Sequence, residues 1–314
     1  MDANLLSERI TLLGPVLRAR FGGPVAKIGL EAGLGCPNRD GTLGHGGCAY
    51  CPPAGSGRGQ GRSSITRQLE QGLERLAARA SRAGREMPRV LAYFQAHTST
   101  HAPAETLALL FEEARAFPGL AGLVVSTRPD CLDPPRWDLL NRLHERLPLW
   151  LELGLQSAHG PTLAAINRGH GLACFDAAVA QARARGIEVV AHVILGLPGE
   201  GIAQTNATAR HLASLGLWGV KMHNLMVLEG APLAADHAAG RFTPWPLEQW
   251  AAAAAHFLAR LPRQTVIHRL AADPGPERLL APAWAARKDL ALKALAGYML
   301  EHDLRQGDLC QNTP

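Results

Sequence analysis

The 314-residue sequence lacks a hydrophobic run long enough to cross a membrane. A membrane-spanning helix needs about 18 or more consecutive apolar residues, and no such stretch occurs. The first residues, MDANLLSERITLLG, also carry acidic side chains where a secretory signal would carry a basic region. We therefore expect a cytoplasmic protein that has no membrane partner.

Cysteine is scarce as well, with six residues in the chain. This is far below the density of a disulfide-stabilised scaffold, and three of the six crowd between positions 36 and 51. Clustered thiols in a reducing compartment indicate a metal site. The net charge of +5 and the pI near 9.1 suit a nucleic-acid partner, but no tract rich in lysine or arginine occurs, so charge alone leaves the partner open.

What the chain does contain is a series of short apolar runs. With 47% hydrophobic residues, it can bury a substantial core. Six runs lack the polar/apolar alternation of a half-exposed strand, and continuous apolar strands are typical of a sheet covered on both faces. The runs are VAKIGL (25–30), RVLAYFQ (89–95), GLVVS (122–126), LWLELGLQ (149–156), IEVVAHVILGL (187–197) and WGVKMHNLMVL (218–228).

Segments with helical spacing separate these runs and predict a parallel α/β sheet. Strands recur roughly every 30 to 40 residues, which is the length of a βαβ unit. We expect an α/β fold, a partial (β/α)6 barrel that is open or partly closed. The predicted helices cover residues 65–83, 104–117, 135–147, 161–185 and 202–215.

The predicted barrel has an extension at each end. Residues 1–24 form an N-terminal helical segment, residues 25–244 the core barrel, and residues 245–314 a C-terminal α/β appendage. The appendage contains a strand at 265–270 between helices at 247–261 and 284–301. The Gly- and Arg-rich segment 55–62 is predicted to be a mobile surface loop, because neither a helix nor a strand gains from that glycine content.

Cys36, Cys48 and Cys51 lie in a Gly-rich loop directly after the first predicted strand, at the end of a parallel sheet where ligands bind. A [4Fe-4S] cluster normally takes four protein thiolates, so three cysteines leave one iron free to bind another molecule. Three alternatives stay open: a zinc site with His45 as fourth ligand, cysteines without metal, and a catalytic thiol. The position after the first strand of a β/α repeat favours the iron–sulfur cluster.

The chain resembles the YhcC/YtqA-like bacterial radical S-adenosylmethionine (SAM) family, distantly similar to the elongator catalytic subunit, in seven ordered motifs. These are CPNRDGTLGHGGCAYC, YFQAHTSTHAP, STRPDCL, ELGLQS, INRGH, AHVILGLPGE and IHRLAADP, and the similarity runs from about Lys27 to Lys288. It implies a radical SAM barrel whose free iron binds the amino and carboxylate groups of SAM. It also implies reductive cleavage of SAM to a 5'-deoxyadenosyl radical, with a one-electron donor such as flavodoxin or ferredoxin. The eleven residues between Cys36 and Cys48 depart from the commoner Cys-x3-Cys-x2-Cys spacing.

The resemblance also implies residues that contact SAM. Tyr50 matches an aromatic position near the adenine, and a tyrosine that shields the cluster from water is the compatible alternative. Gln95 and Thr98 end the second strand, where the superfamily offers polar groups to the SAM amino group, although the familiar Gly-Gly-Glu is absent. Gly196 and Gly199 belong to a glycine-rich segment that lies against adenine in this superfamily.

The fourth predicted strand carries Glu152, Gln156 and Ser157 in an otherwise apolar run. A buried carboxylate is costly unless it is paired or meets a ligand, so Glu152 is a candidate for SAM binding or catalysis. The alternative is a structural ion pair with Lys221 or Arg128. Gln156 would suit the SAM ribose or carboxylate, and Ser157 is a further candidate for SAM binding.

Lys221 and His223 lie two apart on the sixth predicted strand and therefore point to the same side of the sheet. If that side is the barrel interior, they face the substrate as candidate catalytic residues. For His223, and likewise for His192 on the fifth strand, a core histidine with a satisfied hydrogen bond is the alternative.

Three neighbouring residues follow the third predicted strand. Arg128 and Asp130 could hold an anionic part of SAM or of the substrate. Cys131 is expected to be an inert thiol, and the roles of Cys174 and Cys310 stay open.

The family's association with wobble-uridine side-chain maturation implies tRNA as the substrate. Arg58, Arg62 and Arg67 agree with contacts to phosphate, although a solvated basic face gives the same pattern. Two other functions stay open. One is a radical SAM enzyme that acts on a small metabolite or peptide, and the other is a non-catalytic metal-binding or regulatory protein that does not cleave SAM.

Overall fold

The computed structural model describes residues 2–53, 55, 63–274 and 279–310. The predicted mobile loop at 55–62, with Arg58 and Arg62, lies outside the described residues except for Gly55.

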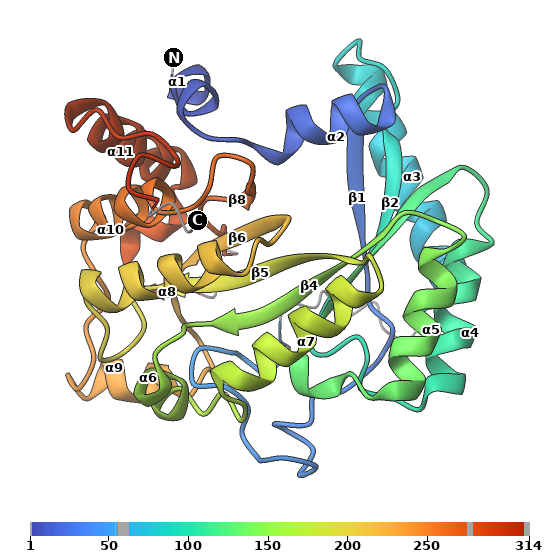
Figure 1. Cartoon of the computed structure of the whole chain (residues 1–314), viewed down its shortest axis with the longest axis horizontal. Coiled ribbons are helices and arrows are strands. Elements are labelled where there is room, and N and C mark those ends of the chain that lie inside the picture. The colour runs from blue at the N-terminus through green and yellow to red at the C-terminus, as the bar shows by residue number, and fades with distance from the viewer. Residues whose placement is uncertain (1, 54, 56–62, 275–278, 311–314) are drawn as a thin grey trace.

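Seven parallel strands form one curled sheet in the order β1-β2-β3-β4-β5-β6-β8, so the predicted partial α/β barrel is confirmed (Figure 1). All eight residues of the fourth strand are buried, as a sheet covered on both faces requires. The strands are β1 (Val25–Leu30), β2 (Arg89–Phe94), β3 (Leu120–Thr127), β4 (Leu149–Gln156), β5 (Glu188–Leu195), β6 (Gly219–Asn224) and β8 (Val266–Arg269).

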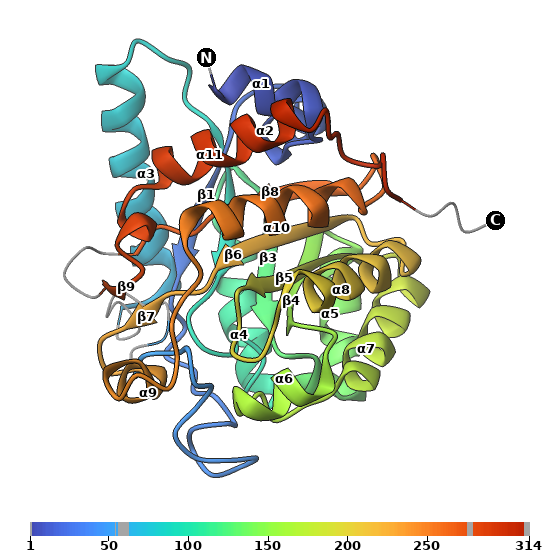
Figure 2. The ribbon, with the colours of Figure 1, turned by 90° about the vertical axis from the view of Figure 1, so that its left-hand side faces the viewer.

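Helices connect the strands and cover the outer face of the sheet (Figures 1 and 2). Gly72 lets the first of these crossover helices approach β1 closely, because a Cβ there would lie 2.5 Å from Cγ2 of Ile28. The crossover helices are α3 (Ile65–Arg82), α4 (Ala104–Arg115), α5 (Pro134–His144), α6 (Gly160–Ala165), α7 (Leu172–Ala184), α8 (Ile202–Ser214) and α10 (Leu247–Ala259).

The prediction of one helix over 161–185 was wrong, because residues 166–171 interrupt it between α6 and α7. Asn167 and Gly169 adopt the left-handed φ values 51° and 79°, which a continuous helix does not allow. The interruption pairs with the cysteine loop: the Ala49 amide donates to the Ile166 carbonyl at 2.9 Å. The break in the helix therefore supports the loop that carries the cysteines.

The predicted C-terminal strand does not stand apart from the barrel. β8 pairs with β6 in parallel, and the pairing begins with Gly219 opposite Val266. It therefore adds a seventh strand to the six that we expected. The predicted run 218–228 ends as β6 at Asn224, and β7 (Val227–Leu228) pairs with β9 (Leu279–Ala281) in a separate antiparallel ribbon. The short helix α9 (Leu233–Ala238) follows β7.

The first helices of the chain lie beside the last one (Figure 2). The N-terminal helices are α1 (Asp2–Arg9) and α2 (Leu13–Phe21), and α11 (Lys288–Glu301) is the last helix. Nη1 of Arg9 donates to the carbonyls of Met299 and Leu304 at 3.2 and 2.9 Å. Among the described residues, no helix combines the length and the apolar character that a membrane span requires.

Inside the curled sheet, side chains form layers along the barrel axis. The layer near the amino ends of the strands is apolar and contains Leu17 of α2 with Leu91, Val124, Trp150 and Val190. Because alternate strand residues point to the same face, the next inward positions follow two residues later, and several of these are charged or polar. The interior therefore changes from an apolar base to a polar middle layer, and above that layer a cavity opens.

Candidate active site

A cavity of about 750 Å³ opens at the carboxyl ends of the strands. This is the end at which ligands bind in α/β barrels. Its wall includes Cys36, Arg39, Cys48, Tyr50, Cys51, Tyr93, Gln95, His97, Thr98, Arg128, Gly154, Gln156, Arg168, His192, Lys221, His223, Asn224 and Arg269.

The cysteine loop, residues 36–51, is held by its own backbone and by Arg39. The Arg39 amide donates to the Cys36 carbonyl at 2.8 Å, and its Nη2 donates to the carbonyls of Cys51 and Pro52, both at 2.8 Å. Gly47 leaves room for this guanidinium group, since a Cβ there would lie 2.7 Å from Cζ of Arg39. One arginine thus fixes the start and the end of the loop together.

Cys48 is buried, and two N–H donors approach its sulfur. Nδ2 of Asn38 and Nη1 of Arg168 both lie 3.7 Å from Sγ, and Nη2 of Arg168 donates to the Gly154 carbonyl at 2.6 Å. Burial alone would raise the pKa of Cys48, but the charge and hydrogen bond of Arg168, together with the hydrogen bond of Tyr50 and the charge of Arg128, lower it below its usual value. The site therefore favours a thiolate at Cys48.

Several buried polar atoms on this wall have no hydrogen-bond partner among the described residues: Thr98 Oγ1, Arg128 Nη1, Arg168 Nε, His223 Nε2 and Asn224 Nδ2. All five residues line the cavity. Buried polar groups are nearly always hydrogen-bonded. Five unpaired polar atoms around one cavity therefore indicate that a polar ligand binds there and supplies the missing hydrogen bonds.

Three cavity residues other than glycine adopt left-handed backbone conformations. Ala96 and His97, which follow β2, have φ values of 73° and 52°, and Gln156 at the end of β4 has 77°. Such conformations cost free energy and cluster at functional sites. They turn the strand ends so that their side chains reach the cavity wall.

Glu152 is fully buried in the polar middle layer and forms short contacts with four side chains. Oε1 accepts from Nζ of Lys27 at 2.6 Å, and Oε2 accepts from Nζ of Lys221 at 2.7 Å and from the hydroxyl of Tyr93 at 2.8 Å. Nε2 of His192 lies 2.7 Å from Oε2. We call Lys27, Tyr93, Glu152, His192 and Lys221 the Glu152 network. Its single carboxylate balances two ammonium groups only in part.

The network shifts the protonation of its members. Burial would raise the pKa of Glu152, but Lys221 and Lys27 hold it well below its usual value. Burial lowers the pKa of Lys221 to about 8, although Glu152 opposes this shift. Burial, together with the charge of Lys221, lowers the pKa of His192 to about 4, so this imidazole is neutral near pH 7.

Comparison with known families identifies the chain. The model of the radical SAM superfamily matches residues 31–212, and that of the radical SAM C-terminal domain matches residues 217–301. The chain belongs to the radical SAM superfamily. The enzymes of this superfamily use a [4Fe-4S] cluster and SAM, and this protein is a radical SAM enzyme.

Individual relatives narrow the family further. Protein YhcC of Escherichia coli K12 is 37% identical over 302 residues, which cover 96% of this chain and 95% of YhcC. The predicted place among the YhcC/YtqA-like proteins is confirmed. A tRNA uridine(34) acetyltransferase of Dehalococcoides mccartyi is 28% identical over 155 residues, which cover 48% of this chain and 33% of that protein.

The elongator resemblance extends to a solved structure. Elp3 of the archaeon Methanocaldococcus infernus superposes with a TM-score of 0.65 at 17% identity. The superposition covers 90% of this chain, whereas this chain spans 64% of that Elp3 chain. At this identity the likeness concerns the fold.

Most residues that the sequence singled out for this radical SAM enzyme line the cavity. The three cysteines, Tyr50, Gln95, Thr98, Gln156, Lys221 and His223 are on its wall. Gly29 accommodates Gln95, because a Cβ there would lie 2.3 Å from Nε2 of that side chain.

Four other predicted residues are not among those that line the cavity. Glu152 lies behind the wall and reaches it through Tyr93, His192 and Lys221. The hydroxyl of Ser157 donates to the Glu200 carboxylate, and Gly196 faces Trp245, whose Cδ2 would lie 3.2 Å from a Cβ at that position. A Cβ atom at Gly199 would have no atom of another described residue within 4 Å. Their assignment to SAM binding remains a prediction.

The residues after β3 form a tight unit. Arg128 makes a bidentate pair with Asp130, with Nε–Oδ1 and Nη2–Oδ2 distances of 2.9 and 2.7 Å. Cys131 is buried, and burial together with Asp130 raises its pKa to about 12. A thiol with this pKa stays protonated near neutral pH.

Four residues of the site were not predicted from the sequence: Lys27, Tyr93, Arg168 and Arg269. For Lys27 a signal was present, because a lysine inside the apolar run VAKIGL is as unusual as the glutamate on the fourth strand. Arg168 lies in the motif INRGH but was assigned to a long helix. Tyr93 and Arg269 lie in the motifs YFQAHTSTHAP and IHRLAADP, but tyrosine is common in strands, so Tyr93 did not stand out as Lys27 does.

The three thiols lie on the wall of one cavity, as the ligands of a shared cluster must. Among the described residues, no group of three or more His, Cys, Asp and Glu is arranged to hold one ion. In a [4Fe-4S] cluster each thiolate binds a different iron, so the cysteines stand farther apart than around zinc. His45, the fourth ligand of the zinc alternative, is exposed beside Gly41 and is not among the cavity residues.

Proposed function

We propose that Cys36, Cys48 and Cys51 hold a [4Fe-4S] cluster, that the cavity binds SAM beside it, and that the enzyme modifies the side chain of the wobble uridine in tRNA. The observation that carries the proposal is the placement of three thiols on the wall of a cavity where five buried polar atoms have no hydrogen-bond partner among the described residues. When bound, the reduced cluster supplies one electron that cleaves SAM to methionine and a 5'-deoxyadenosyl radical, which removes a hydrogen atom from the substrate.

The chain's own residues prepare the site in three ways. Arg168 stabilises the thiolate of Cys48 and keeps one N–H for a ligand. Thr98 and Arg128 offer unpaired polar atoms to the amino-acid part of SAM, and Gln95 and Gln156 flank them on the wall. Tyr50 lines the cavity with the cysteines, and we expect its ring to limit access of water to them.

Lys221 and His223 face the cavity from β6 and are the proposed substrate contacts. Glu152 acts through Lys221: it holds the ammonium group at 2.7 Å and thereby fixes its place in the wall. We therefore assign Glu152 a positioning role, and we assign direct contact with the substrate to Lys221 and His223.

A wobble-uridine substrate is supported by the similarity to a tRNA uridine(34) acetyltransferase and by the net charge of +5. A flavodoxin or ferredoxin would supply the electron. A small metabolite or a peptide is the competing substrate class, and it predicts little affinity for RNA.

The first experiment purifies the protein without oxygen. We expect the visible absorbance of an iron–sulfur cluster and about four iron and four sulfide per chain. Each of Cys36→Ala, Cys48→Ala and Cys51→Ala abolishes formation of 5'-deoxyadenosine from SAM, because each removes one cluster ligand. Cys174→Ala and Cys310→Ala are the matched controls and keep full cleavage. Zinc in place of iron, or cleavage retained by any of the first three variants, contradicts the cluster assignment.

The second experiment tests the substrate. We expect bulk tRNA to increase 5'-deoxyadenosine formation and a deletion strain to show a changed pattern of wobble nucleosides. An unchanged nucleoside pattern would remove tRNA as the substrate but would leave the cluster assignment intact.

A further inference from the structure

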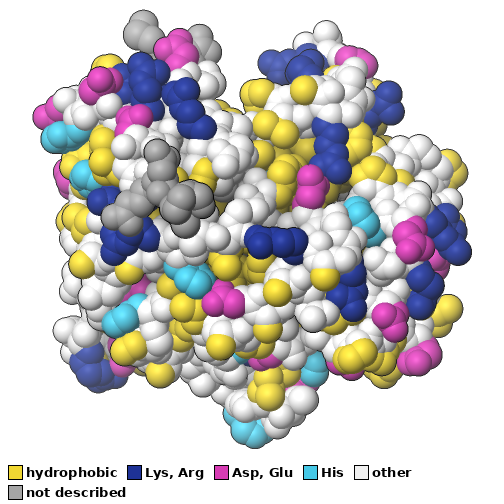
Figure 3. Space-filling model, viewed as in Figure 1, with side chains coloured by type: hydrophobic (Ala, Val, Ile, Leu, Met, Phe, Trp, Pro, Cys, Tyr) yellow, Lys and Arg dark blue, Asp and Glu magenta, His cyan; other side chains and the backbone are white. Residues whose placement is uncertain are grey.

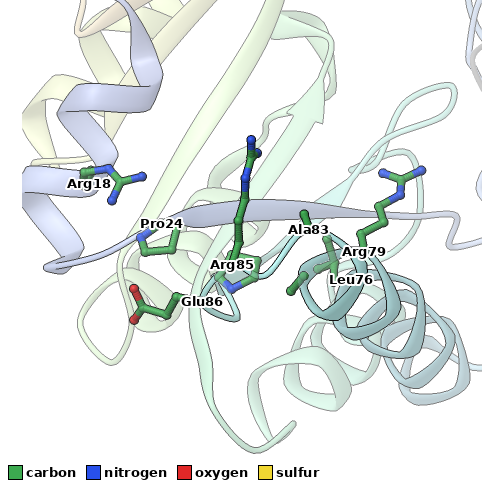
Figure 4. Close-up of a pocket in the computed structure, with 9 residues that line it drawn as sticks. Arg18, Pro24, Leu76, Arg79, Ala83, Arg85 and Glu86 are labelled. Carbon is green, nitrogen blue, oxygen red and sulfur yellow. The ribbon is translucent and has the colours of Figure 1, made fainter.

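A second hollow lies at the opposite end of the sheet from the candidate active site. It measures about 500 Å³, and its lining includes Pro24 and Pro88, which precede β1 and β2 (Figure 4). Leu76, Ala80 and Ala83 of the α3 region form an apolar floor. In the view of Figure 4, the guanidinium groups of Arg18, Arg79 and Arg85 stand on one side of the hollow, and the Glu86 carboxylate lies on the other.

The arginines of this hollow belong to a larger basic surface. Arg75, Arg79 and Arg82 are spaced four and three residues apart on α3, which places them on one face of the helix. Together with Arg18, Arg85 and Arg89, which lie around the end of that helix, we call them the arginine face. All six residues are exposed.

The arginine face carries uncompensated charge. None of its six guanidinium groups forms a salt bridge with a described carboxylate, whereas the neighbours Arg20 and Arg67 pair with Glu188 and Glu70. Over α4 and α5, at the right of Figure 3, basic and acidic side chains alternate, as in the pair of Arg115 with Glu112 at 2.5 Å. Like charges four residues apart destabilise a helix, so the free protein bears a cost that an anionic partner would relieve.

The arginine face is connected to the candidate active site by α3 itself. The start of the helix lies at the carboxyl end of β1, because Oε1 of Gln68 accepts from the Glu31 amide at 2.8 Å. From there the 18-residue helix extends for about 27 Å along the edge of the molecule (Figure 2). Its last turn reaches the hollow, where the Arg89 amide donates to the Pro24 carbonyl at 2.8 Å.

We propose that the arginine face binds the phosphate backbone of the RNA whose nucleotide enters the cavity. This inference rests on the proposed tRNA substrate and adds the surface that would hold its stem. A duplex stem is a polyanion long enough to follow a helix of this length, and arginine is well suited to phosphate contacts. The apolar floor accommodates a ribose or the edge of a base between two phosphates.

The test uses Arg79→Gln/Arg85→Gln in the full-length holoenzyme and measures binding of bulk tRNA over a range of salt concentrations. We expect the Kd to rise roughly tenfold, and the slope of log affinity against log salt to fall in magnitude by about 1.8, because each lost phosphate contact removes about 0.9. Arg142→Gln/Arg210→Gln, which neutralises two exposed arginines on α5 and α8, is the matched control and keeps the wild-type slope.

Three outcomes separate this inference from the proposed function. If wild type binds tRNA and the Arg79→Gln/Arg85→Gln variant matches it in Kd and slope, the arginine face is not the docking surface and the substrate proposal stands. If wild type binds no tRNA, both proposals fail. If polyglutamate displaces tRNA at equal charge concentration, the surface fits an acidic protein and the RNA assignment is overturned. Cleavage of SAM without tRNA stays at the wild-type rate in both variants, which shows that they fold.

Discussion

On the cysteine wall of the cavity, which consists of the three cysteines, Thr98, Arg128 and Arg168, each of the two guanidinium groups keeps a buried N–H that has no partner among the described residues, whereas in the Glu152 network the carboxylate contacts four neighbours. Both regions bury charge next to the same cavity. The cysteine wall leaves its polar atoms for a ligand to complete, and the network satisfies its carboxylate within the protein. Because an unpaired buried charge is costly, the two regions should respond in opposite ways to the loss of a polar group.

The largest effect is expected for Glu152→Gln. Loss of the carboxylate leaves two buried ammonium groups without their counter-ion, so the free energy of unfolding falls by about 3 kcal/mol or more. Chemical denaturation of the cluster-free protein measures the change, and the exposed Glu229→Gln is the control. Cluster content stays normal, while the increase of SAM cleavage by tRNA weakens because Lys221, the proposed substrate contact, loses its anchor. Wild-type stability would show that the carboxylate does not compensate the two ammonium groups, and a wild-type response to tRNA would leave Glu152 a purely structural role.

The next effect is a dependence of stability on pH. Burial lowers the pKa of His192 and of His268 to about 4 from 6.5, so the unfolded chain binds more protons than the folded protein between these pH values. Stability therefore falls as pH falls from about 6.5 to 4, by about 1.4 kcal/mol per pH unit for each histidine. His192→Gln should reduce the measured slope by its own contribution of about 1.4 kcal/mol per pH unit, and the exposed His302→Gln should leave the slope unchanged. A slope equal to that of wild type in His192→Gln would show that this imidazole is already protonated in the folded protein.

A smaller loss is expected for Tyr93→Phe. The hydroxyl donates to Glu152 and accepts from Nζ of Lys221 at 2.7 Å, and hydrogen bonds to charged groups contribute about 2 kcal/mol to stability. Thermal and chemical unfolding measure the loss of stability, and Tyr298→Phe is the control. The Tyr298 hydroxyl lies 3.4 Å from Nε2 of His256, so its hydrogen bond should contribute less to stability. Equal losses in the two variants would argue against a special role of the network.

The smallest change in stability is expected on the cysteine wall, for Thr98→Val. The hydroxyl of Thr98 has no partner among the described residues, so its replacement by a methyl group leaves the unfolding free energy of the cluster-free protein unchanged within about 0.5 kcal/mol. Its SAM affinity, measured in the reconstituted protein, should fall roughly tenfold, the equivalent of one charge-neutral hydrogen bond. A clear loss of stability together with unchanged SAM affinity would show that the Thr98 hydroxyl is satisfied within the protein, as the Glu152 carboxylate is, and does not bind SAM.

Much of this organisation could be predicted from local sequence. The apolar runs located the first six strands of the sheet, and the position of the cysteines after β1 indicated the ligand end. The break at 166–171 was missed, although Asn167, Gly169 and Gly171 are residue types that commonly end helices, and contacts with the cysteine loop hold the segment in place. Arg168 was missed with this break, although its guanidinium group reaches the sulfur of Cys48.

The sequence by itself determined the elements, their order and the three cysteines, because apolar periodicity and cysteine spacing are local properties. Tertiary structure decided which partners meet. Lys27 and Lys221 are separated by 194 positions in the chain, yet both contact one carboxylate, because parallel strands place alternate residues inside the same barrel. The enclosed arrangement also set their charge states, since burial and neighbouring charge act through space and not along the chain.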